Sequence, residues 1–514
     1  MTKSAAKPEI IPEVAKIGAR ITEFRERKQM TQAAFAELLG TSQSAVARME
    51  KGEQNLSARM MLRIGEILDH DIIGPPTQAL NFRIVGGRKL SGTVATKTSK
   101  NEAVVMLCAS LLNRGTTTLK RMPRIEEVYR VIEVLQSIGV QVRWEDSDVI
   151  ITPPKRLKID GMDKDAAMRT RSVLLLLGPL IHLLGDFHIP QPGGCKLGAR
   201  TVRPHLYALE NFGVNIITHR GDYHVTAKNL HANDDAVLYE SGDTVTENAL
   251  MAAAKIKGTT IIKFASANYM VQDLCIFLQT LGVKIEGVGS STLTVHGRPD
   301  IDKDVSYSIS EDPIESMLFL TAALVTKSAI TIERCPIDFL ELELLKMQKM
   351  GFRYTATKRY KSDNGNTDLV DITTEPTTKL TALEEKIHPD IYPGLNMDNL
   401  PFFALIATQA KGQTLIHDWP YENRAIYYLE LTKLGADMIL ADPHRIYVNG
   451  PTPLRPAEVV CPPALRPAAI ILLAMLAADG TSILRNVYSI NRGYEDLYAR
   501  LNLLGADIRV LKEL

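Results

Sequence analysis

A pattern that recurs six times between Leu80 and Leu514 constrains the fold more than any other feature of this sequence. Each copy has a helical run rich in alanine and leucine, a small turn, a β-type run, a second helix and a second turn, often Leu-Gly. The first turn lies at Gly115, Gly185, Gly258, Lys327, Gly412 and Gly480. The second lies at Gly139, Gly213, Gly282, Gly351, Gly435 and Gly505. The turns of one copy are about 25 residues apart and the copies recur roughly every 70 residues, which indicates one repeated structural unit.

The helical runs of the repeat are apolar on most sides, as in 173–177 and 470–473. Such a helix needs to be buried all round. An arrangement with helices inside and sheets outside meets this requirement. Six copies therefore predict an α/β protein with two lobes of three units each, and a cleft between the lobes is a natural ligand site. We call this region, residues 80–514, the body.

The first part of the chain has a different, purely helical periodicity. Its apolar residues recur every three or four positions, at Val14, Ile17, Ile21, Phe24, Phe35, Leu38, Leu39, Val46 and Met49. Thr31 and Thr41 can each cap a helix, and Gly40 can form a left-handed corner between them. The pattern predicts a small all-α domain over residues 13–73, the head, with Val46 and Met49 facing its core.

The stretch 31–52, T-Q-A-A-F-A-E-L-L-G-T-S-Q-S-A-V-A-R-M-E-K-G, resembles the helix-turn-helix of the Cro and lambda-repressor type. The resemblance implies that the second helix of the motif enters the major groove of DNA, with the protein as a homodimer. The residues expected to contact DNA are Ser42, Gln43, Ser44 and Arg48, with Gln32 near a phosphate. The alternative is a helical module for protein contact, because acidic and basic residues are about equally frequent in this segment.

The remaining boundaries follow from local composition. Gly74-Pro75-Pro76-Thr77 cannot continue a helix, since proline lacks an amide hydrogen, so residues 74–79 are predicted to be a linker. Residues 1–12 are expected to form a flexible tail. The net charge of +1 gives no overall attraction to nucleic acid or membrane, so any DNA contact must come from a local face.

Several observations favour a cytoplasmic protein that does not contact a membrane. The five cysteines are scattered without a Cys-x-x-Cys pair, which indicates neither a disulfide framework nor a zinc site and fits a reducing compartment. Residues 1–11 contain no apolar run typical of a signal peptide. The longest apolar run, near 468–478, is too short to span a bilayer.

Eight segments of the body match, in order, the motifs of one family. They are S-K-N-E-A (99–103), R-S-V-L-L-L-L-G-P-L (171–180), P-G-G-C-K-L-G-A-R (192–200), T-E-N-A-L-M-A-A (246–253), D-P-I-E-S (312–316), E-N-R (422–424), L-R-P-A-A (465–469) and R-G-Y-E (492–495). On these segments the body resembles the UDP-N-acetylglucosamine 1-carboxyvinyltransferases and, more distantly, the 5-enolpyruvylshikimate-3-phosphate synthases. The resemblance covers essentially all of the body.

This resemblance implies a fold and a reaction. The fold is a two-lobed inside-out α/β barrel of six repeats, with lobe 1 at 80–99 and 301–514 and lobe 2 at 100–300. The reaction is transfer of the enolpyruvyl group of phosphoenolpyruvate to a hydroxyl of a sugar nucleotide, UDP-N-acetylglucosamine, with release of phosphate, in peptidoglycan precursor synthesis. No cofactor and no metal ion are expected.

The glycine-rich segment contains the cysteine of greatest interest. Cys195 stands where the family keeps its active-site cysteine, after Gly193 and Gly194 and before Arg200. A nearby arginine favours the thiolate. The resemblance implies that Cys195 protonates the methylene carbon of phosphoenolpyruvate or bonds to its C2 atom. The alternative is a buried structural cysteine.

Phosphoenolpyruvate carries a carboxylate and a phosphate, so its site needs several cations. The resemblance assigns Lys100 and Arg466 to catalysis and Arg171, Arg200 and Arg424 to substrate binding. Any one of these side chains alone is more often a surface charge. Each lies inside a matching motif, which favours the functional interpretation.

Three further polar residues are expected on the acceptor side. The resemblance makes Asp312 the base that takes a proton from the acceptor hydroxyl, and it places Asp398 in the cleft as a second, substrate-binding aspartate. Asn101 would hydrogen-bond the acceptor. An aspartate before a proline can also be an ordinary turn residue.

The nucleotide side departs from the family pattern. After G-A-R the family has P-V-D-L-H, whereas this chain has T-V-R-P-H, with Arg203 in place of the aspartate. Glu240 and Asp243 lie near the expected diphosphate, where like charges repel. Asn268-Tyr269-Met270 replaces E-P-E, and Asn491 replaces an aspartate. Two alternatives to the expected enzyme therefore stay open: an enolpyruvyl transferase with another acceptor, and a metabolite-sensing transcriptional regulator.

Overall fold

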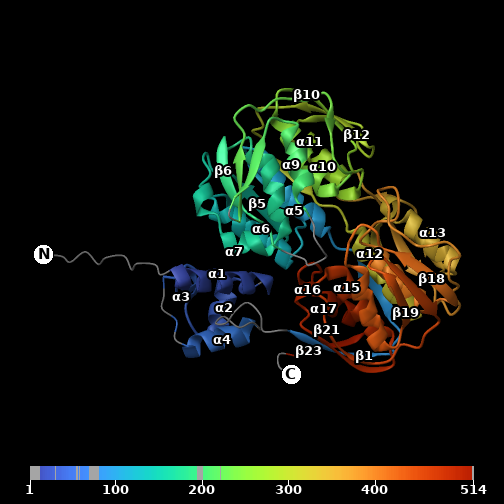
Figure 1. The fold of residues 1–514 in the computed structure, drawn as a ribbon. Coiled ribbons are helices and arrows are strands. Elements are labelled where there is room, and N and C mark those ends of the chain that lie inside the picture. Colours follow the sequence, from blue (N-terminus) through green and yellow to red (C-terminus); the bar gives the residue numbers. More distant parts are fainter. Residues whose placement is uncertain are drawn as a thin grey trace. The chain divides into compact units, whose positions relative to one another are not determined.

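The computed structural model describes residues 12–28, 30–53, 56, 58–68, 80–193, 201–219 and 221–511. The chain divides into two compact units, and the division falls between Leu80 and Asn81. The first unit contains the head and the second is the body, and each is described by itself (Figure 1).

The described part of the head consists of the helices α1 (Pro12–Arg27), α2 (Gln32–Leu39), α3 (Gln43–Glu50) and α4 (Ala58–Leu68). The Thr31 hydroxyl caps α2 by accepting a hydrogen bond from a first-turn amide at 3.1 Å, and Gly40 ends this helix with a φ of 69°. The Ser42 hydroxyl caps α3 by accepting from the Ala45 amide at 3.2 Å. The prediction of Thr41 as this cap is wrong, because the extended backbone of Ser42 directs its own hydroxyl at the free amides.

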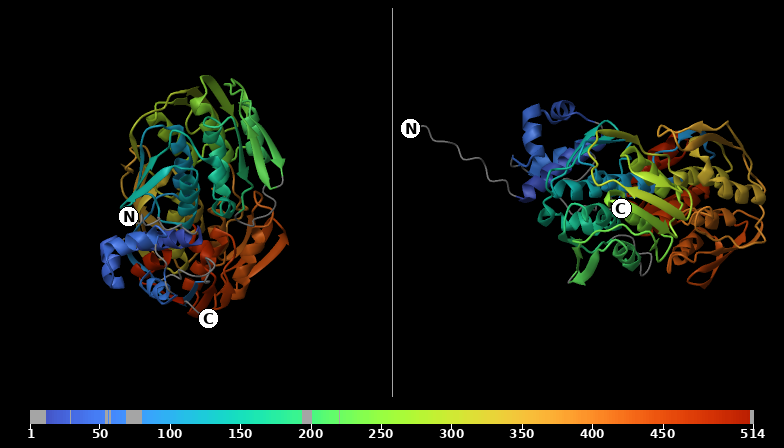
Figure 2. Two further views of the ribbon diagram at one scale, coloured as in Figure 1. Left: turned by 90° about the vertical axis from the view of Figure 1, so that its left-hand side faces the viewer. Right: turned by 90° about the horizontal axis from the view of Figure 1, so that it is seen from above.

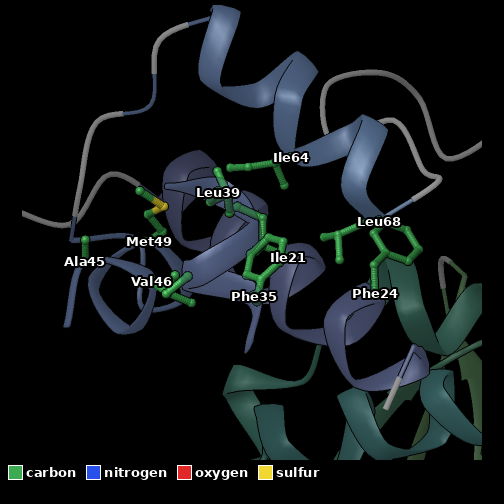
Figure 3. Packing of buried hydrophobic residues seen from close by; sticks show 10 residues of the cluster. Ile21, Phe24, Phe35, Leu39, Ala45, Val46, Met49, Ile64 and Leu68 are labelled. Atoms are coloured by element: carbon green, nitrogen blue, oxygen red, sulfur yellow. The ribbon is translucent and has the colours of Figure 1, made fainter. Parts of the chain in front are cut away.

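The core of the head draws side chains from all four helices (Figure 3). Its larger buried members are Ile21, Phe24, Phe35, Leu39, Val46, Met49, Ile64 and Leu68. The burial of Val46 and Met49 confirms that one face of α3 belongs to the core. An ion pair between Arg25 Nε and Glu50 Oε1, 2.6 Å apart, joins α1 to the end of α3. The core contacts and this ion pair hold α3 in place. The face of α3 opposite the core is exposed.

Lobe 2 of the body contains three sheets, with strand orders β13-β3-β5-β4, β6-β8-β7 and β11-β12-β10-β9. Its strands are β3 (Thr117–Lys120), β4 (Gln141–Glu145), β5 (Asp148–Thr152), β6 (Asp186–Pro190), β7 (Asn215–His219), β8 (Asp222–Thr226), β9 (Ala236–Val237), β10 (Gly258–Lys263), β11 (Lys284–Glu286), β12 (Thr292–Gly297) and β13 (Val305–Ser308). Because β13 pairs in parallel with β3, the chain leaves lobe 2 after Ser308 and not at residues 300–301.

Lobe 1 contains the other three described sheets, with strand orders β21-β22-β1-β23, β15-β17-β14-β2 and β18-β20-β19, and β16 also pairs with β17. Its strands are β1 (Asn81–Gly86), β2 (Ser91–Ala95), β14 (Ala329–Pro336), β15 (Tyr354–Ala356), β16 (Tyr360–Lys361), β17 (Asp368–Thr374), β18 (Gly412–His417), β19 (Asp437–Asp442), β20 (Arg445–Gly450), β21 (Glu458–Val460), β22 (Gly480–Arg485) and β23 (Asp507–Leu511). The first strand of the body thus completes a sheet whose other strands lie in residues 458–511, and the second strand completes a sheet whose other strands lie in residues 329–374.

The helices of each lobe lie between its sheets (Figures 1 and 2). Those of lobe 2 are α5 (Lys100–Ala109), α6 (Glu126–Ser137), α7 (Lys164–Arg169), α8 (Leu177–Leu180), α9 (Arg203–Glu210), α10 (Asp243–Lys255), α11 (Tyr269–Thr280) and the 3-10 helices η1 (Ser110–Leu112), η2 (Ile159–Gly161) and η3 (Arg171–Leu176). Those of lobe 1 are α12 (Pro313–Val325), α13 (Glu341–Met350), α14 (Leu400–Ala407), α15 (Leu465–Ala477), α16 (Tyr488–Asn491), α17 (Leu497–Leu503), η4 (Ile337–Phe339) and η5 (Ala425–Leu434). Every residue of α12 and α14 is buried. The predicted arrangement, helices inside and sheets outside in two lobes, is confirmed.

Ten of the twelve turn residues of the repeat have a left-handed backbone, and Gly115 and Gly185 are the two exceptions. All six glycines of the second turn have a positive φ, from 81° at Gly213 to 107° at Gly351. In the first turn Gly258, Gly412 and Gly480 also have positive φ, and Lys327 has a φ of 53°. Glycine takes this conformation without a Cβ penalty, so it ends the helix and turns the chain into the next strand.

We predict that Gly351→Ala destabilises the body, because its φ of 107° is unfavourable for alanine and a Cβ there would lie 2.8 Å from the Lys379 carbonyl oxygen. We expect a loss of about 1–3 kcal/mol in the free energy of unfolding. Urea unfolding followed by tryptophan fluorescence would measure it, since both tryptophans, Trp144 and Trp419, belong to the body. Gly185→Ala is the matched control, because no atom lies within 4 Å of its added Cβ. An equal effect of the two substitutions would contradict the prediction.

Candidate active site where the chain crosses between the lobes

The chain crosses between the lobes twice, and the two crossing segments pair with each other. The Asp312 amide donates a hydrogen bond to the Lys97 carbonyl at 2.9 Å, and the Ser99 amide donates to the Ser310 carbonyl at 2.8 Å. Ser99 caps α5 and Asp312 caps α12, so a helix begins directly after each crossing. The pairing therefore brings together the first residues of two helices that belong to different lobes.

Lys100, the first residue of α5, lies in a group of charged side chains. Burial lowers the pKa of Lys100, Glu127 opposes this effect, and Arg466 and Arg492 add to it. The Glu127 carboxylate accepts hydrogen bonds from the Thr170 hydroxyl at 2.5 Å and the Ser172 hydroxyl at 2.9 Å. Asp398 also favours the charged form of Lys100, and the group brings together three cations, Lys100, Arg466 and Arg492, that can bind a small multiply charged anion.

Glu127 is held in its ionised form by this group. Burial acts to raise the pKa of Glu127, but Lys100 and Arg492 outweigh it and lower the pKa. Arg492 Nε lies 3.7 Å from Glu127 Oε2, so the carboxylate links lobe 2 to a residue near the end of α16 in lobe 1. Because both cations interact with Glu127, Lys100 and Arg492 lie on the same side of the site.

Arg466 and Asp398 form a second charged pair in the site. Arg466 Nε lies 3.2 Å from Asp398 Oδ2, and Arg466 Nη1 donates a hydrogen bond to the Tyr494 hydroxyl at 2.6 Å. Burial opposes ionisation of Asp398, but Arg466, Arg424 and Lys100 together lower its pKa. Asp398 is therefore ionised at neutral pH, and it orients the Arg466 guanidinium.

Asp312 has a different electrostatic environment. Burial raises the pKa of the Asp312 carboxyl to about 6, against the opposing charge of Arg466. One of its oxygens accepts a hydrogen bond from the Ile314 amide at 2.8 Å. A carboxylate with this pKa is ionised at neutral pH and can still take up a proton, which suits a general base.

The remaining predicted residues have specific partners. Asn101 Nδ2 donates to the Tyr269 hydroxyl at 3.0 Å, and Arg171 Nη2 donates to the Thr201 carbonyl at 3.0 Å. Arg424 is buried, and it donates to both oxygens of Asp418 at 2.6 and 2.7 Å.

The structure thus brings five predicted residues close to the crossing segments. Two others, Arg424 and Arg171, do not belong to this group directly. Lys100, Asp312, Asp398 and Arg466 interact electrostatically, and Asn101 follows Lys100 on α5. Arg424 reaches this group only through Asp398, with Nη1 at 3.9 Å from Oδ1. Arg171 lies in η3. Cys195 and Arg200 lie outside the described residues.

Four residues of the site were not assigned a role from the sequence: Glu127, Tyr269, Arg492 and Tyr494. Arg492 and Tyr494 belong to the R-G-Y-E segment, so that motif was a usable signal. Tyr269 lies where the sequence departs from the family. Glu127 is the second of two glutamates at the start of an ordinary helix, and no local pattern distinguishes it from a surface residue.

A cavity of about 200 Å³ lies between the lobes beside Met397, the neighbour of Asp398. Phe339 and Tyr392 form an aromatic part of its wall, with ring centroids 5.3 Å apart. The charged residues that line it are Asp243, Asp338, Glu341, Glu343 and Asp390. Arg359 pairs with Asp338 and Glu341, and burial raises the pKa of Asp243 and of Glu343. Among the described residues, no lysine or arginine belongs to the lining, so it offers no cation to a group with several negative charges.

No metal site and no membrane segment is found in the part of the chain that the structure describes. Among those residues, no group of three or more His, Cys, Asp and Glu side chains is arranged to hold a metal ion. Within the same ranges, every helix is too short or too polar to cross a bilayer.

The residues expected to contact DNA lie on or beside α3 of the head. Gln43, Ser44 and Arg48 are exposed on this helix. Ser42 is exposed too, and its hydroxyl caps the helix. Gln32 Nε2 donates to Glu50 Oε2 at 2.7 Å, so its amide group is engaged inside the head.

The chain matches two family models. Residues 84–501 match the model of EPSP synthase (3-phosphoshikimate 1-carboxyvinyltransferase). Residues 21–71 match a helix-turn-helix model.

Curated relatives and solved structures match the same region. The UDP-N-acetylglucosamine 1-carboxyvinyltransferase of Bradyrhizobium diazoefficiens is 33% identical over 84% of this chain and 99% of that protein, and that of Bacteroides thetaiotaomicron is 32% identical over 83% and 99%. The enolpyruvyl transferase NikO from Streptomyces tendae has a TM-score of 0.72 and 26% identity, over 84% of this chain and 99% of that one. An EPSP synthase from Acinetobacter baumannii, with a TM-score of 0.65 and 18% identity over 84% and 100%, shares the fold.

If Asp312 accepts a proton in the reaction, the rate must depend on its ionised fraction. That fraction falls as the pH drops through the pKa of about 6, so we expect kcat/KM for phosphate release from phosphoenolpyruvate to be level above this pH and to fall below it. The phosphate group of phosphoenolpyruvate also titrates in this pH range. Calorimetric measurement of its binding at each pH separates that effect from the titration of Asp312. A kcat/KM that rises as the pH falls would refute Asp312 as the base.

Proposed function

Because the chain belongs to the EPSP synthase family of enolpyruvyl transferases, we propose that it transfers the enolpyruvyl group of phosphoenolpyruvate to a hydroxyl of a sugar nucleotide, UDP-N-acetylglucosamine, with release of phosphate. The observation that supports this most is the cationic group of Lys100, Arg466 and Arg492 beside the Asp312 carboxylate, where the chain crosses between the lobes. In this role the protein contributes to peptidoglycan precursor synthesis. The proposed site residues supply binding, proton transfer and charge stabilisation, without a cofactor.

We assign the steps to this chain's residues as follows. Lys100, Arg466 and Arg492 bind the phosphate and carboxylate of phosphoenolpyruvate. Asp312 takes the proton from the acceptor hydroxyl as its oxygen bonds to C2, while Cys195 gives a proton to C3. The product of this addition is a tetrahedral ketal. The Cys195 thiolate then takes a proton back from C3 as the bond from C2 to the phosphate oxygen breaks, which releases phosphate and restores the double bond.

The other predicted residues take supporting roles in this proposal. Arg171 and Arg200 bind the phosphate from the side of the glycine-rich segment, and Asn101 hydrogen-bonds the acceptor. Asp398 holds Arg466 in place and faces the acceptor. Arg424 contributes through Asp398, because its Nε and Nη2 atoms are bound to Asp418.

A second candidate is an enolpyruvyl transferase with a different acceptor. The observation that favours it is the lining of the cavity beside Met397, whose described residues present carboxylates and no lysine or arginine to a diphosphate. Asp243 lies in this lining, where its two oxygens accept from the Ser266 hydroxyl at 2.6 Å and from Asn268 Nδ2 at 3.1 Å. Arg203, the first residue of α9, is exposed in place of the aspartate expected there.

We further infer that the head binds DNA through α3, as a homodimer, and that the protein acts in the cytoplasm. Exposed Gln43 and Arg48 carry the donors that read adenine and guanine edges. The four described cysteines are free thiols, which fits a reducing compartment. If the body binds phosphoenolpyruvate or a cell-wall precursor without turnover, it becomes the sensor of a transcriptional regulator.

The enzyme proposal predicts that the purified protein releases phosphate when it is given phosphoenolpyruvate and UDP-N-acetylglucosamine together. Cys195→Ala should lower this rate by about 100-fold or more, because it removes the proton donor. Cys195→Asp is the matched control and should keep part of the activity, since a carboxylic acid can also donate a proton. Binding of both ligands without phosphate release would contradict the enzyme proposal, and release only with another acceptor would support the second candidate.

The DNA proposal predicts that Gln43→Ala combined with Arg48→Ala removes sequence-specific binding to a palindromic site. Each good contact with a base edge contributes about 1–3 kcal/mol. Binding to selected DNA at a stated salt concentration, measured by fluorescence anisotropy, would test this. Arg63→Ala is the charge-matched control, since Arg63 is exposed on α4. Unchanged specificity in the double variant, or no DNA binding by the wild type at low salt, would refute the assignment.

A further inference from the structure

A buried carboxylate next to Asp312 joins the two lobes. The Glu311 side chain is fully buried, and its Oε1 accepts hydrogen bonds from Arg121 Nη1 at 2.6 Å and Arg334 Nε at 2.8 Å. Its Oε2 accepts from the Ser362 hydroxyl at 2.7 Å. Arg121 directly follows β3 of lobe 2, whereas Arg334 belongs to β14 of lobe 1. One carboxylate thus holds a guanidinium from each lobe.

The two arginines occupy corresponding places in the first repeat of each lobe. Both have a left-handed backbone, with a φ of 58° at Arg121 and 61° at Arg334, which is unfavourable for residues other than glycine. The Arg121 amide donates to Asp148 at 3.0 Å, and the Arg334 amide donates to Asp371 at 3.0 Å. Phe264 and Asn486 have the same left-handed backbone directly after β10 and β22, so this turn recurs in the repeat, and at Arg121 and Arg334 it brings a guanidinium to Glu311. Such strain persists only where the surrounding contacts enforce it.

The hairpin loop between β16 and β17 of lobe 1 adds a second carboxylate. Asp363 Oδ2 lies 2.9 Å from Arg121 Nη1 and 3.1 Å from Arg334 Nη2. In the same loop Asn364 Nδ2 donates to Asp273 Oδ1, in α11 of lobe 2, at 3.1 Å. We call Arg121, Glu311, Arg334 and Asp363 the hinge clamp. Its two cations are balanced by two carboxylates, so removal of one carboxylate leaves two partly buried cations that share a single negative charge.

The hinge clamp holds the very segment on which the site is built. Glu311 lies between Ser310, whose carbonyl accepts from Ser99, and Asp312, whose amide donates to Lys97. Lys100 and Asp312 project from opposite lobes immediately beyond these hydrogen bonds. A change in the angle between the lobes at the crossing segments therefore changes the distance between the Lys100 and Asp312 side chains.

We propose that Glu311 is a positioning residue for the transfer reaction. Through the hinge clamp it sets the angle between the lobes at the crossing segments, and thereby the separation of Lys100 and Asp312. The proposal rests on the proposed function, because the reaction rate is what reports this separation.

Glu311→Gln tests the proposal, because it keeps the shape and an acceptor oxygen but removes the charge. We expect kcat to fall about tenfold or more, since small displacements of reacting groups have effects of this size. KM for phosphoenolpyruvate should rise too, because its proposed binding residues, Lys100 in lobe 2 and Arg466 and Arg492 in lobe 1, move with the lobes. Hydrogen exchange should become faster in peptides covering 96–99 and 310–312 and stay unchanged in α15. Glu333→Gln is the matched control, an exposed glutamate next to Arg334.

Asp363→Asn provides a second variant that removes a charge from the exposed side of the hinge clamp. Its side chain is 49% exposed, so the body should fold normally. We expect the same changes in kcat and local exchange as in Glu311→Gln, but smaller. This variant keeps the test decisive if Glu311→Gln does not fold.

Unchanged kcat and unchanged local exchange in both variants would overturn the proposal. Faster exchange throughout the body, in proportion to the loss of kcat, would also overturn it, because the residue would then act only on stability. Absence of phosphate release from the wild type would contradict the proposed function instead. In that case, faster exchange confined to the crossing segments still supports the hinge clamp, and unchanged exchange overturns it.

Discussion

The candidate site depends on the antiparallel pairing of two short segments, in which Asp312 donates to Lys97 and Ser99 donates to Ser310. These segments are about 210 residues apart in the chain, yet each ends at the cap of a helix that carries site residues. Because the capped helices belong to different lobes, the lobes meet where the chemistry is expected. The site is thus fixed by main-chain hydrogen bonds, which do not depend on the side chains that would react.

Around this pairing, buried charges are compensated in small groups. Arg466 is paired with Asp398, Arg424 with Asp418, and Glu127 with Lys100 and Arg492. A buried charge without a partner is costly, so each group holds its members in one geometry. Beside Lys100, three cations, Lys100, Arg466 and Arg492, lie in one buried group with Glu127 and Asp398. Several cations gathered in this way suit the carboxylate and phosphate of phosphoenolpyruvate.

The repeat made the body predictable from its sequence. The six glycines after the second helix could be recognised because their positive φ excludes most other residues, and the apolar helices could be recognised because nothing polar interrupts them. The sequence predicts that the chain leaves lobe 2 at residues 300–301. This boundary is too early, because β13 pairs in parallel with β3, a strand almost 190 residues before it. In the head, Thr41 and Ser42 are both capable caps, and only the backbone conformation decides between them.

By itself the sequence determined the two units, the six repeats and the family, and it predicts most side chains of the candidate site, because each depends on residue types at short spacing. The tertiary structure decided the partners. It paired Arg424 with Asp418, placed Glu127 and Arg492 beside Lys100, and joined Arg121 to Arg334 through Glu311. These contacts link residues from separate repeats. They exist only after the sheets and helices have packed, and no local pattern in the chain encodes them.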